Sequence, residues 1–174
     1  MKASTWMAIT LVPIMLTTAA AFALPRSGQA LSAAMVQTLD GKTLDTRNLQ
    51  GKITLIFYED KDTTQQNRAL KDALIAQKKS PGRRDNVRIY GVADVSSWDF
   101  WPAKGFVTDA IRKQEQQSGN PIYCDWSGDF GRALGATPNN SNVVLIGPDG
   151  KVKLALAGPL PSDTRQLILS ETGK

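Results

Sequence analysis

The stretch Gly51 to Leu70, GKITLIFYEDKDTTQQNRAL, decides the fold. A Gly-Lys pair opens it, and an uninterrupted apolar run follows from Ile53 to Tyr58. Such a run, bounded by polar turn residues, is typical of a strand buried on both faces. After an acidic loop, Asp62 and Gln65 have the spacing of a capping box at a helix start. We therefore predict a strand, a short loop and a helix from about Thr63 to Lys79.

The start of this helix is a position where chemistry is favoured. Backbone N–H groups and the positive end of the helix dipole point at whatever lies on the first turn. A cysteine at such a place has a lowered pKa and becomes a nucleophile. Here the first turn carries Asp62, Thr63, Gln65 and Gln66, and none of them is a thiol.

The rest of the chain alternates between strand and helix patterns. We expect further strands at Ala34 to Leu39, Val87 to Ala93, Pro121 to Trp126, Asn142 to Ile146 and Val152 to Ala157, and helices from Pro102, from Ser127 to Leu134 and from Ser162 or Asp163. Three strands interleaved with helices, then a hairpin and a last helix, predict an α/β fold. Right-handed crossovers then give a mixed central sheet flanked by helices on both faces.

The first stretch resembles the active-site segment of the redoxins, in the thioredoxin-like superfamily. Peroxiredoxins carry the pattern F-Y/F-P-x-x-x-T-x-x-C, and the same frame here runs through Phe57-Tyr58 and Thr63 to Gln66. In the thioredoxin frame the two redox cysteines fall near Asp62 and Gln65. The resemblance implies a thioredoxin-like fold whose catalytic cysteine positions are occupied by other residues.

A second resemblance covers Pro121 to Val152. Redoxins commonly read P-x-x-x-D-x-x-G here, with a later glycine and a D-G hairpin turn, and this chain has Pro121, Asp125, Gly128, Gly135 and Asp149-Gly150. The thioredoxin cis-proline position, counted back from the hairpin glycine, falls on Ser141, close to Pro138. Within the superfamily the chain is similar to the exported YtfJ-type branch.

The N-terminus has the pattern of a signal peptide. Lys2 precedes a short apolar run from Trp6 to Leu16, and Ala21-Phe22-Ala23 is an A-x-A cleavage site. We predict a signal peptide at 1–23, a flexible lead-in at 24–33 and one redoxin domain at 34–174. The predicted protein is exported, periplasmic or secreted, with no stable membrane span after cleavage; an uncleaved anchor is the alternative.

The chain has one cysteine and no histidine. This excludes an intrachain disulfide, a Ser-His-Asp or Cys-His catalytic arrangement and a Cys/His zinc site. Cleavage after Ala23 leaves 20 basic and 16 acidic residues, a modest excess that does not indicate nucleic-acid binding. We expect no metal and no cofactor.

Three places were considered as sites. Gln66 and Thr63 bind an anion or a carbonyl at the helix start, or they only cap a helix in a solvated turn. The acidic loop after the central strand, with Glu59, Asp60 and Asp62, lacks the ligand spacing of an EF-hand and is expected to be solvated. Cys124 lies in an apolar strand and is expected to be a buried core residue; the alternative is a single reactive thiol.

An aromatic loop is the feature that most suggests binding. Trp98, Phe100 and Trp101 lie within a segment that otherwise reads as loop between a strand and a helix. They either fill the core or form an exposed anchor for a protein partner, because such residues dominate interface energetics. We expect at least one of the two tryptophans to be exposed.

Three functions remain open. The first is a non-redox binding or adaptor protein of the cell envelope, with another envelope protein as its partner. The second is a thiol oxidoreductase or antioxidant protein that uses Cys124 alone. The third is a structural component of an envelope assembly. Catalysis is the less favoured reading, because the redox positions carry Asp62, Gln65 and Gln66.

Overall fold

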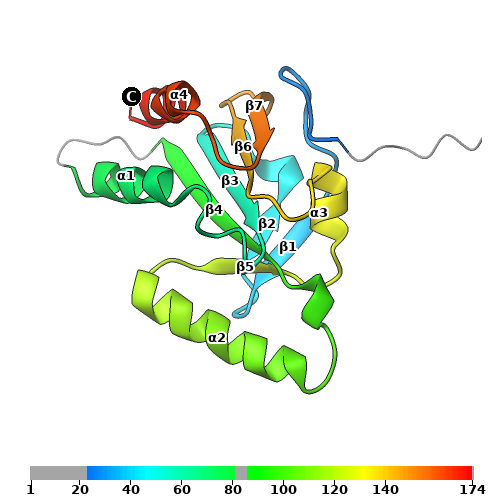
Figure 1. Cartoon of the computed structure of the whole chain (residues 1–174). Helices are drawn as coiled ribbons and strands as arrows, with labels where there is room; N and C mark the ends of the chain where they lie inside the picture. The colour runs from blue at the N-terminus through cyan, green and yellow to red at the C-terminus, as the bar shows by residue number, and fades with distance from the viewer. Residues whose placement is uncertain (1–22, 81–85, 174) are drawn as a thin grey trace, which may run out of the picture.

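The computed structural model describes residues 23–80 and 86–173. Strands and helices alternate along the chain (Figure 1). In order they are β1 (Met35–Thr38), β2 (Thr43–Asp45), η1 (Thr46–Asn48), β3 (Ile53–Glu59), α1 (Arg68–Lys79), β4 (Val87–Asp94), η2 (Ser96–Trp98), α2 (Ala103–Ser118), β5 (Ile122–Asp125), α3 (Asp129–Leu134), β6 (Asn142–Ile146), β7 (Val152–Ala157) and α4 (Ser162–Thr172). The predicted signal peptide lies outside the described residues, apart from Ala23.

The strands form one mixed sheet in the order β2-β1-β5-β4-β3-β6-β7 within the described residues. β3 runs parallel to β4, and β4 runs parallel to β5. β6 pairs antiparallel with the other side of β3, and β1 pairs antiparallel with β5. The apolar run of the first stretch is therefore a central strand, and every residue from Ile53 to Glu59 is buried.

Side chains alternate between the two faces of β3 and build separate cores. Leu55 and Phe57 pack with Leu70 of α1 and Ile168 of α4. Ile56 and Tyr58 point to the other face, toward Phe130 of α3. Figure 1 shows α3 on the opposite side of the molecule from α1 and α4, as the prediction of helices on both faces requires.

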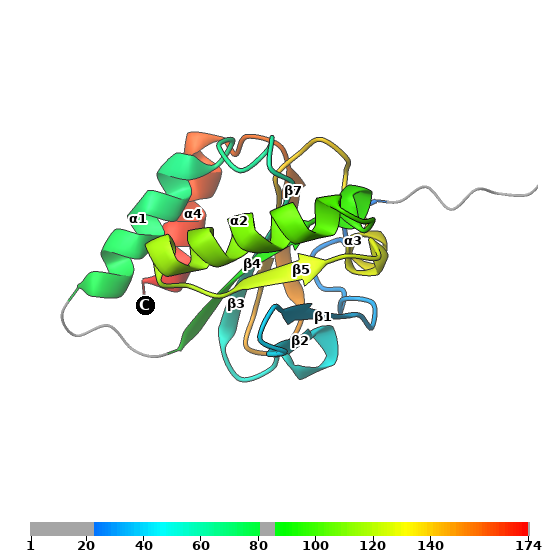
Figure 2. The ribbon, with the colours of Figure 1, turned by 90° about the horizontal axis from the view of Figure 1, so that it is seen from below.

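The third core cluster lies under α2. Ile111 of α2 packs with Val95 and Cys124. Ala93 and Cys124 are register partners, so their side chains share the face that α1 covers. Figure 2 shows α2 running along β5, with α1 and α4 beside it.

The predicted start of the first helix is wrong. The helix begins at Arg68, and the residues from Lys61 to Asn67 are turns. Asp60 Oδ1 accepts hydrogen bonds from the backbone N–H groups of Asp62 and Thr63 at 2.9 Å. These local bonds compete with helix formation, so no Asp62–Gln65 capping box forms.

The segment predicted as a lead-in, residues 24–33, contacts the domain. Gly28 N donates to Val152 O at 2.8 Å, and Val152 N donates to Gln29 O at the same distance. Leu24 and Leu31 pack on the core cluster that contains Phe130. Leu24 and Leu31 therefore hold the segment against the domain, while residues 26–30 between them are exposed.

Candidate functional site

Loops from both halves of the chain meet at the carboxyl ends of β3, β4 and β5. β6 begins at the same edge, since Asn142 lies opposite Tyr58 at the end of β3. The loop before β6 is thus brought beside the loop between β3 and α1. The carboxyl edge of an open α/β sheet is where such folds place their ligands.

The two halves of the sequence resemblance meet at this edge. Ser141 N donates to Gln66 Oε1 at 2.9 Å, although the two residues are 75 positions apart. Gln66 Nε2 donates to the backbone oxygen of Asn139 at 3.4 Å. The peroxidatic-cysteine position and the cis-proline position of the redoxin frames are therefore direct neighbours, and their polar groups bond to each other.

A buried polar network continues inward from this contact. Lys71 Nζ lies 2.8 Å from Glu59 Oε2 and donates to Thr64 O at 2.5 Å. Ser141 Oγ donates to Glu59 Oε1 at 2.6 Å and accepts from Asn67 Nδ2 at 2.9 Å. We call Glu59, Gln66, Asn67, Lys71 and Ser141 the polar network.

Asn67 connects the network to the segment between β7 and α4. Its amide donates to Gly158 O at 3.0 Å and accepts from Leu160 N at 2.9 Å. Asn67 is the N-cap residue of α1, yet its side chain makes no cap bond because these tertiary partners use it. The start of α1 therefore has no side-chain cap from Asn67, and Gln66 bonds to Ser141 instead of capping the helix.

The acidic loop does not behave as one solvated unit. Glu59 ends β3 and is buried, whereas the side chain of Asp62 is 81% exposed. Thr63 is buried, and its Oγ1 accepts a hydrogen bond from Asp60 N at 3.0 Å. Gln65 is exposed. Within residues 23–80 and 86–173, no group of three or more acidic or cysteine side chains could hold a metal ion.

A cavity of about 330 Å³ opens beside the network at the same edge. Its lining includes the polar residues Tyr58, Asp60, Asp94, Ser96, Arg132 and Asn140. The lining comes from the loops after β3 and β4 and from the segment between β5 and β6.

Tyr58 joins the cavity wall to a buried carboxylate. Its hydroxyl donates to Asp125 Oδ2 at 3.1 Å, and Gly131 N donates to the same oxygen at 2.9 Å. A Cβ on Gly131 would overlap the hydroxyl of Tyr58, so only glycine allows α3 to approach this closely. Burial, followed by the charges of Asp125 and Asp94, raises the pKa of Tyr58.

Cys124 lies away from this edge of loops, beneath α2. It is 5% exposed, and its Sγ contacts Ile122 O at 3.7 Å. Burial, and then the charge of Glu115, raises the pKa of the Cys124 thiol to about 11. At neutral pH the thiol is protonated and has little access to solvent.

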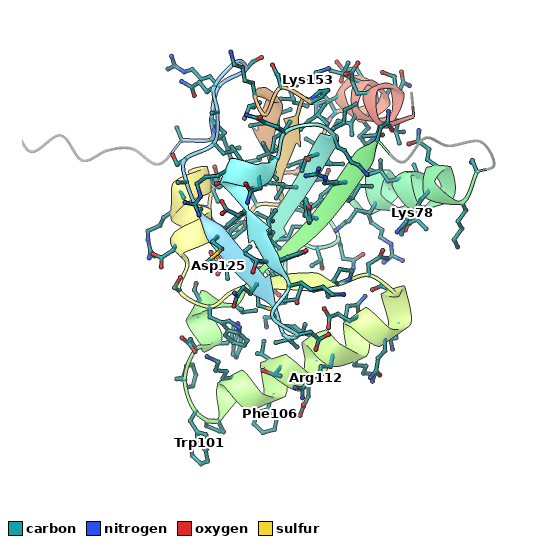
Figure 3. The ribbon with its side chains drawn as sticks, turned by 180° about the vertical axis from the view of Figure 1, so that it is seen from behind. Lys78, Trp101, Phe106, Arg112, Asp125 and Lys153 are labelled. Carbon is teal, nitrogen blue, oxygen red and sulfur yellow. The ribbon has the colours of Figure 1, made fainter. Side chains whose placement is uncertain are left out.

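The segment after β4 and the first turn of α2 present an exposed aromatic surface, formed by Trp98, Phe100, Trp101 and Phe106. Trp101 is 91% exposed and Phe106 is 73% exposed. Figure 3 shows both side chains pointing away from the domain at the start of α2. The prediction that at least one tryptophan of this loop is exposed is confirmed.

Trp98 is the inner member of the aromatic surface. It is 37% exposed, and Lys61 Nζ lies over its ring at 5.3 Å from the centroid. Near the start of α2, Asp99 pairs with Lys104 Nζ at 2.6 Å. Trp98 is therefore the member that connects the exposed aromatics to the loop after β3.

Sequence reasoning missed Asn67, Lys71 and Asp94. Lys71 and Asn67 have no local signal, since their partners lie on distant strands and loops. Asp94 directly follows the strand predicted from Val87 to Ala93, and a place just after the carboxyl end of a strand was a usable signal. Among the described residues the cis peptide bond precedes Pro102, so the Thr137–Pro138 bond is trans. No helix in the described part of the chain is long and apolar enough to cross a membrane.

Comparison with known proteins identifies the fold. No protein-family model matches the chain, and no curated protein matches its sequence. A Chlorobium tepidum protein described as the thiol:disulfide interchange protein DsbE has a TM-score of 0.63 and 17% identity, over 87% of this chain and 100% of its own.

Two further solved structures are similar. StoA from Bacillus subtilis has a TM-score of 0.56 and 16% identity, over 79% of this chain and 96% of its own. The exposed lipoprotein thioredoxin Etrx1 from Streptococcus pneumoniae has a TM-score of 0.57 and 16% identity, over 80% and 99%. These likenesses confirm the predicted thioredoxin-like α/β fold, and at such identities they show the fold alone.

Proposed function

We propose that the chain is an exported thioredoxin-fold binding protein of the cell envelope, related to the YtfJ-type branch, which contacts a protein partner and lacks thiol redox catalysis. The observation that carries this proposal is the direct bond between Gln66 and Ser141. The two positions where redoxin chemistry is expected hold neutral side-chain and backbone groups that satisfy each other.

Thiol catalysis needs a thiolate at an accessible, electropositive place. The single cysteine is buried, lies on β5 and has a raised pKa. The helix start carries no cysteine, and the polar network fills the space behind it. The similar solved proteins include one named for thiol:disulfide interchange, with which this chain shares the fold at 17% identity.

The aromatic surface supports binding as the role. Four large aromatic side chains are exposed within nine residues at the carboxyl edge, and the largest exposure is that of Trp101. Exposed tryptophans are frequent anchors of protein interfaces because they bury a large area at a small cost in side-chain entropy.

A turnover assay tests the absence of redox catalysis. The purified protein should neither consume peroxide with a thiol reductant nor reduce insulin disulfides above the rate of the buffer. If turnover appears and Cys124→Ser removes it, the protein is a one-cysteine enzyme and the proposal is wrong.

A capture experiment tests the binding role. The protein is cross-linked in the intact envelope, and the yield of its main cross-linked partner is compared between wild type and variants. Trp101→Ala should reduce that yield at least tenfold. Leu167→Ala is the matched control, because Leu167 is a 50% exposed apolar residue on α4, away from the aromatic surface. Equal yields from both variants would remove the aromatic surface as the binding site.

A further inference from the structure

The aromatic surface and the cavity belong to one continuous region. Asp94 and Ser96 line the cavity, and Trp98, Phe100 and Trp101 follow in the same loop. From the other side, Asp60 lines the cavity, and its neighbour Lys61 lies over the ring of Trp98. A polypeptide that covers the aromatic surface therefore passes the mouth of the cavity.

The charges of the cavity are unequal. Asp60 and Asp94 are its carboxylates, and neither has a basic partner at salt-bridge distance within the described residues. Arg132 is the basic residue of the lining, and its guanidinium is paired with Asp129 in the same helix. Lys71 is paired with Glu59. Lys61 lies over Trp98 at the mouth, and its ammonium group is 4.0 Å from the exposed carboxylate of Asp62.

Each carboxylate is held in place by neutral donors. Asp94 Oδ1 accepts from Ser96 N at 3.1 Å and from Ser96 Oγ at 2.7 Å. Asp60 Oδ1 accepts from the backbone of Asp62 and Thr63 at 2.9 Å. Fixed carboxylates of this kind form strong, charge-assisted hydrogen bonds with an incoming cation. Burial is the main cause of the raised pKa of Tyr58, and the nearby charges of Asp125 and Asp94 raise it further.

We propose that the cavity takes a lysine or arginine side chain of the partner polypeptide, while apolar residues beside it cover the aromatic surface. The volume of about 330 Å³ lies at the lower end for ligand sites, which suits one side chain better than a large cofactor. This inference rests on the proposed binding function and specifies the chemistry of the partner.

The test uses three short probe peptides and the exported protein. The peptides are acetyl-Leu-Arg-Leu-amide, its citrulline counterpart, which is neutral and nearly isosteric, and its glutamate counterpart. Binding is followed by shifts of backbone amide resonances during NMR titration. The arginine peptide should shift the resonances of Ser96 and Asn140, with a Kd at least fivefold lower than that of the citrulline peptide. Equal binding of these two peptides, or no binding of either, would overturn the inference.

Two variants locate the effect. Asp94→Asn should remove the preference for arginine over citrulline. Asp40→Asn should keep this preference, because Asp40 is an exposed carboxylate far from the cavity. It lies in the turn after β1. Thr38, at the end of β1, pairs near the start of β5, so this turn is at the opposite edge of the sheet. Since the peptide comparison is made on the wild-type protein, it does not depend on how the variants fold.

Other outcomes separate this inference from the proposed function. If the envelope partner is lost in Trp101→Ala but retained in Asp94→Asn, the binding role stands. The inference that the cavity takes a basic side chain is then wrong. If the protein sediments with phosphatidylglycerol vesicles through Trp101 and independently of Asp94, the surface faces a membrane and the inference is overturned.

Discussion

Replacing Lys71 by methionine tests whether the polar network at the carboxyl edge of the sheet stabilises the folded protein. The ammonium group lies 2.8 and 3.1 Å from the two carboxylate oxygens of Glu59. The side chains are 24% and 9% exposed, so solvent screens this pair little. Methionine keeps most of the volume of lysine and removes the charge.

The expected loss follows from what remains around Glu59. Its carboxylate keeps the hydrogen bond from Ser141 and loses its cation. Removing one partner of a buried ion pair costs about 3–5 kcal/mol, because the other charge stays buried. For a chain of this size, that corresponds to a fall in Tm of roughly 6–20 °C.

Thermal unfolding followed by circular dichroism measures this loss. Glu59→Gln combined with Lys71→Met should recover more than half of it, since the glutamine oxygen still accepts from Ser141 and no charge is buried. Arg68→Met is the matched control on the same helix. Arg68 pairs with Asp72 at 3.0 Å, but both side chains are more than half exposed, and such pairs contribute about 0.5 kcal/mol or less. A Tm for Lys71→Met within about 2 °C of wild type would refute the reasoning.

The remaining predictions concern the thiol, the exposed tryptophan and the close approach of α3. Cys124 should react with a thiol reagent at least a hundredfold more slowly in the native than in the unfolded protein, as absorbance assays would show; comparable rates would mean an open site. Because the pKa of the Cys124 thiol is raised from 9.0 to about 11, its contribution to stability is present below pH 9 and lost as pH rises toward 11. Urea unfolding should therefore show a smaller fall in the free energy of unfolding between pH 9 and 11 for Cys124→Ala than for wild type. Trp101→Ala should change the free energy of unfolding by less than about 0.5 kcal/mol, since the side chain is 91% exposed; a larger loss would mean that it packs. Gly131→Ala should cost about 1–3 kcal/mol, because the added methyl group displaces the hydroxyl of Tyr58 from Asp125; an unchanged urea midpoint would contradict the close packing.

Local sequence patterns determined most of the architecture. The apolar run from Ile53 to Tyr58 can only be buried on both faces, so it predicted a central strand. β6 and β7 were predicted with the observed bounds, since an Asp-Gly turn between two apolar runs is a strong hairpin signal. The exposure expected for the aromatic loop also followed from sequence, because three large rings in a short loop cannot all reach a core.

Only the tertiary structure decided what the site is. The bond between Gln66 and Ser141 joins residues 75 positions apart, and the ion pair of Lys71 with Glu59 joins a helix to a strand. No local pattern encodes such partners, because the first depends on how β6 is placed beside β3 and the second on how α1 packs back over β3. The start of α1 was misjudged for a different reason: the local hydrogen bonds of Asp60 hold Asp62 and Thr63 in a turn, so the helix begins only after Asn67. Sequence therefore specified which residues stand at the edge of the sheet, and the packing of distant segments decided that their polar groups satisfy one another.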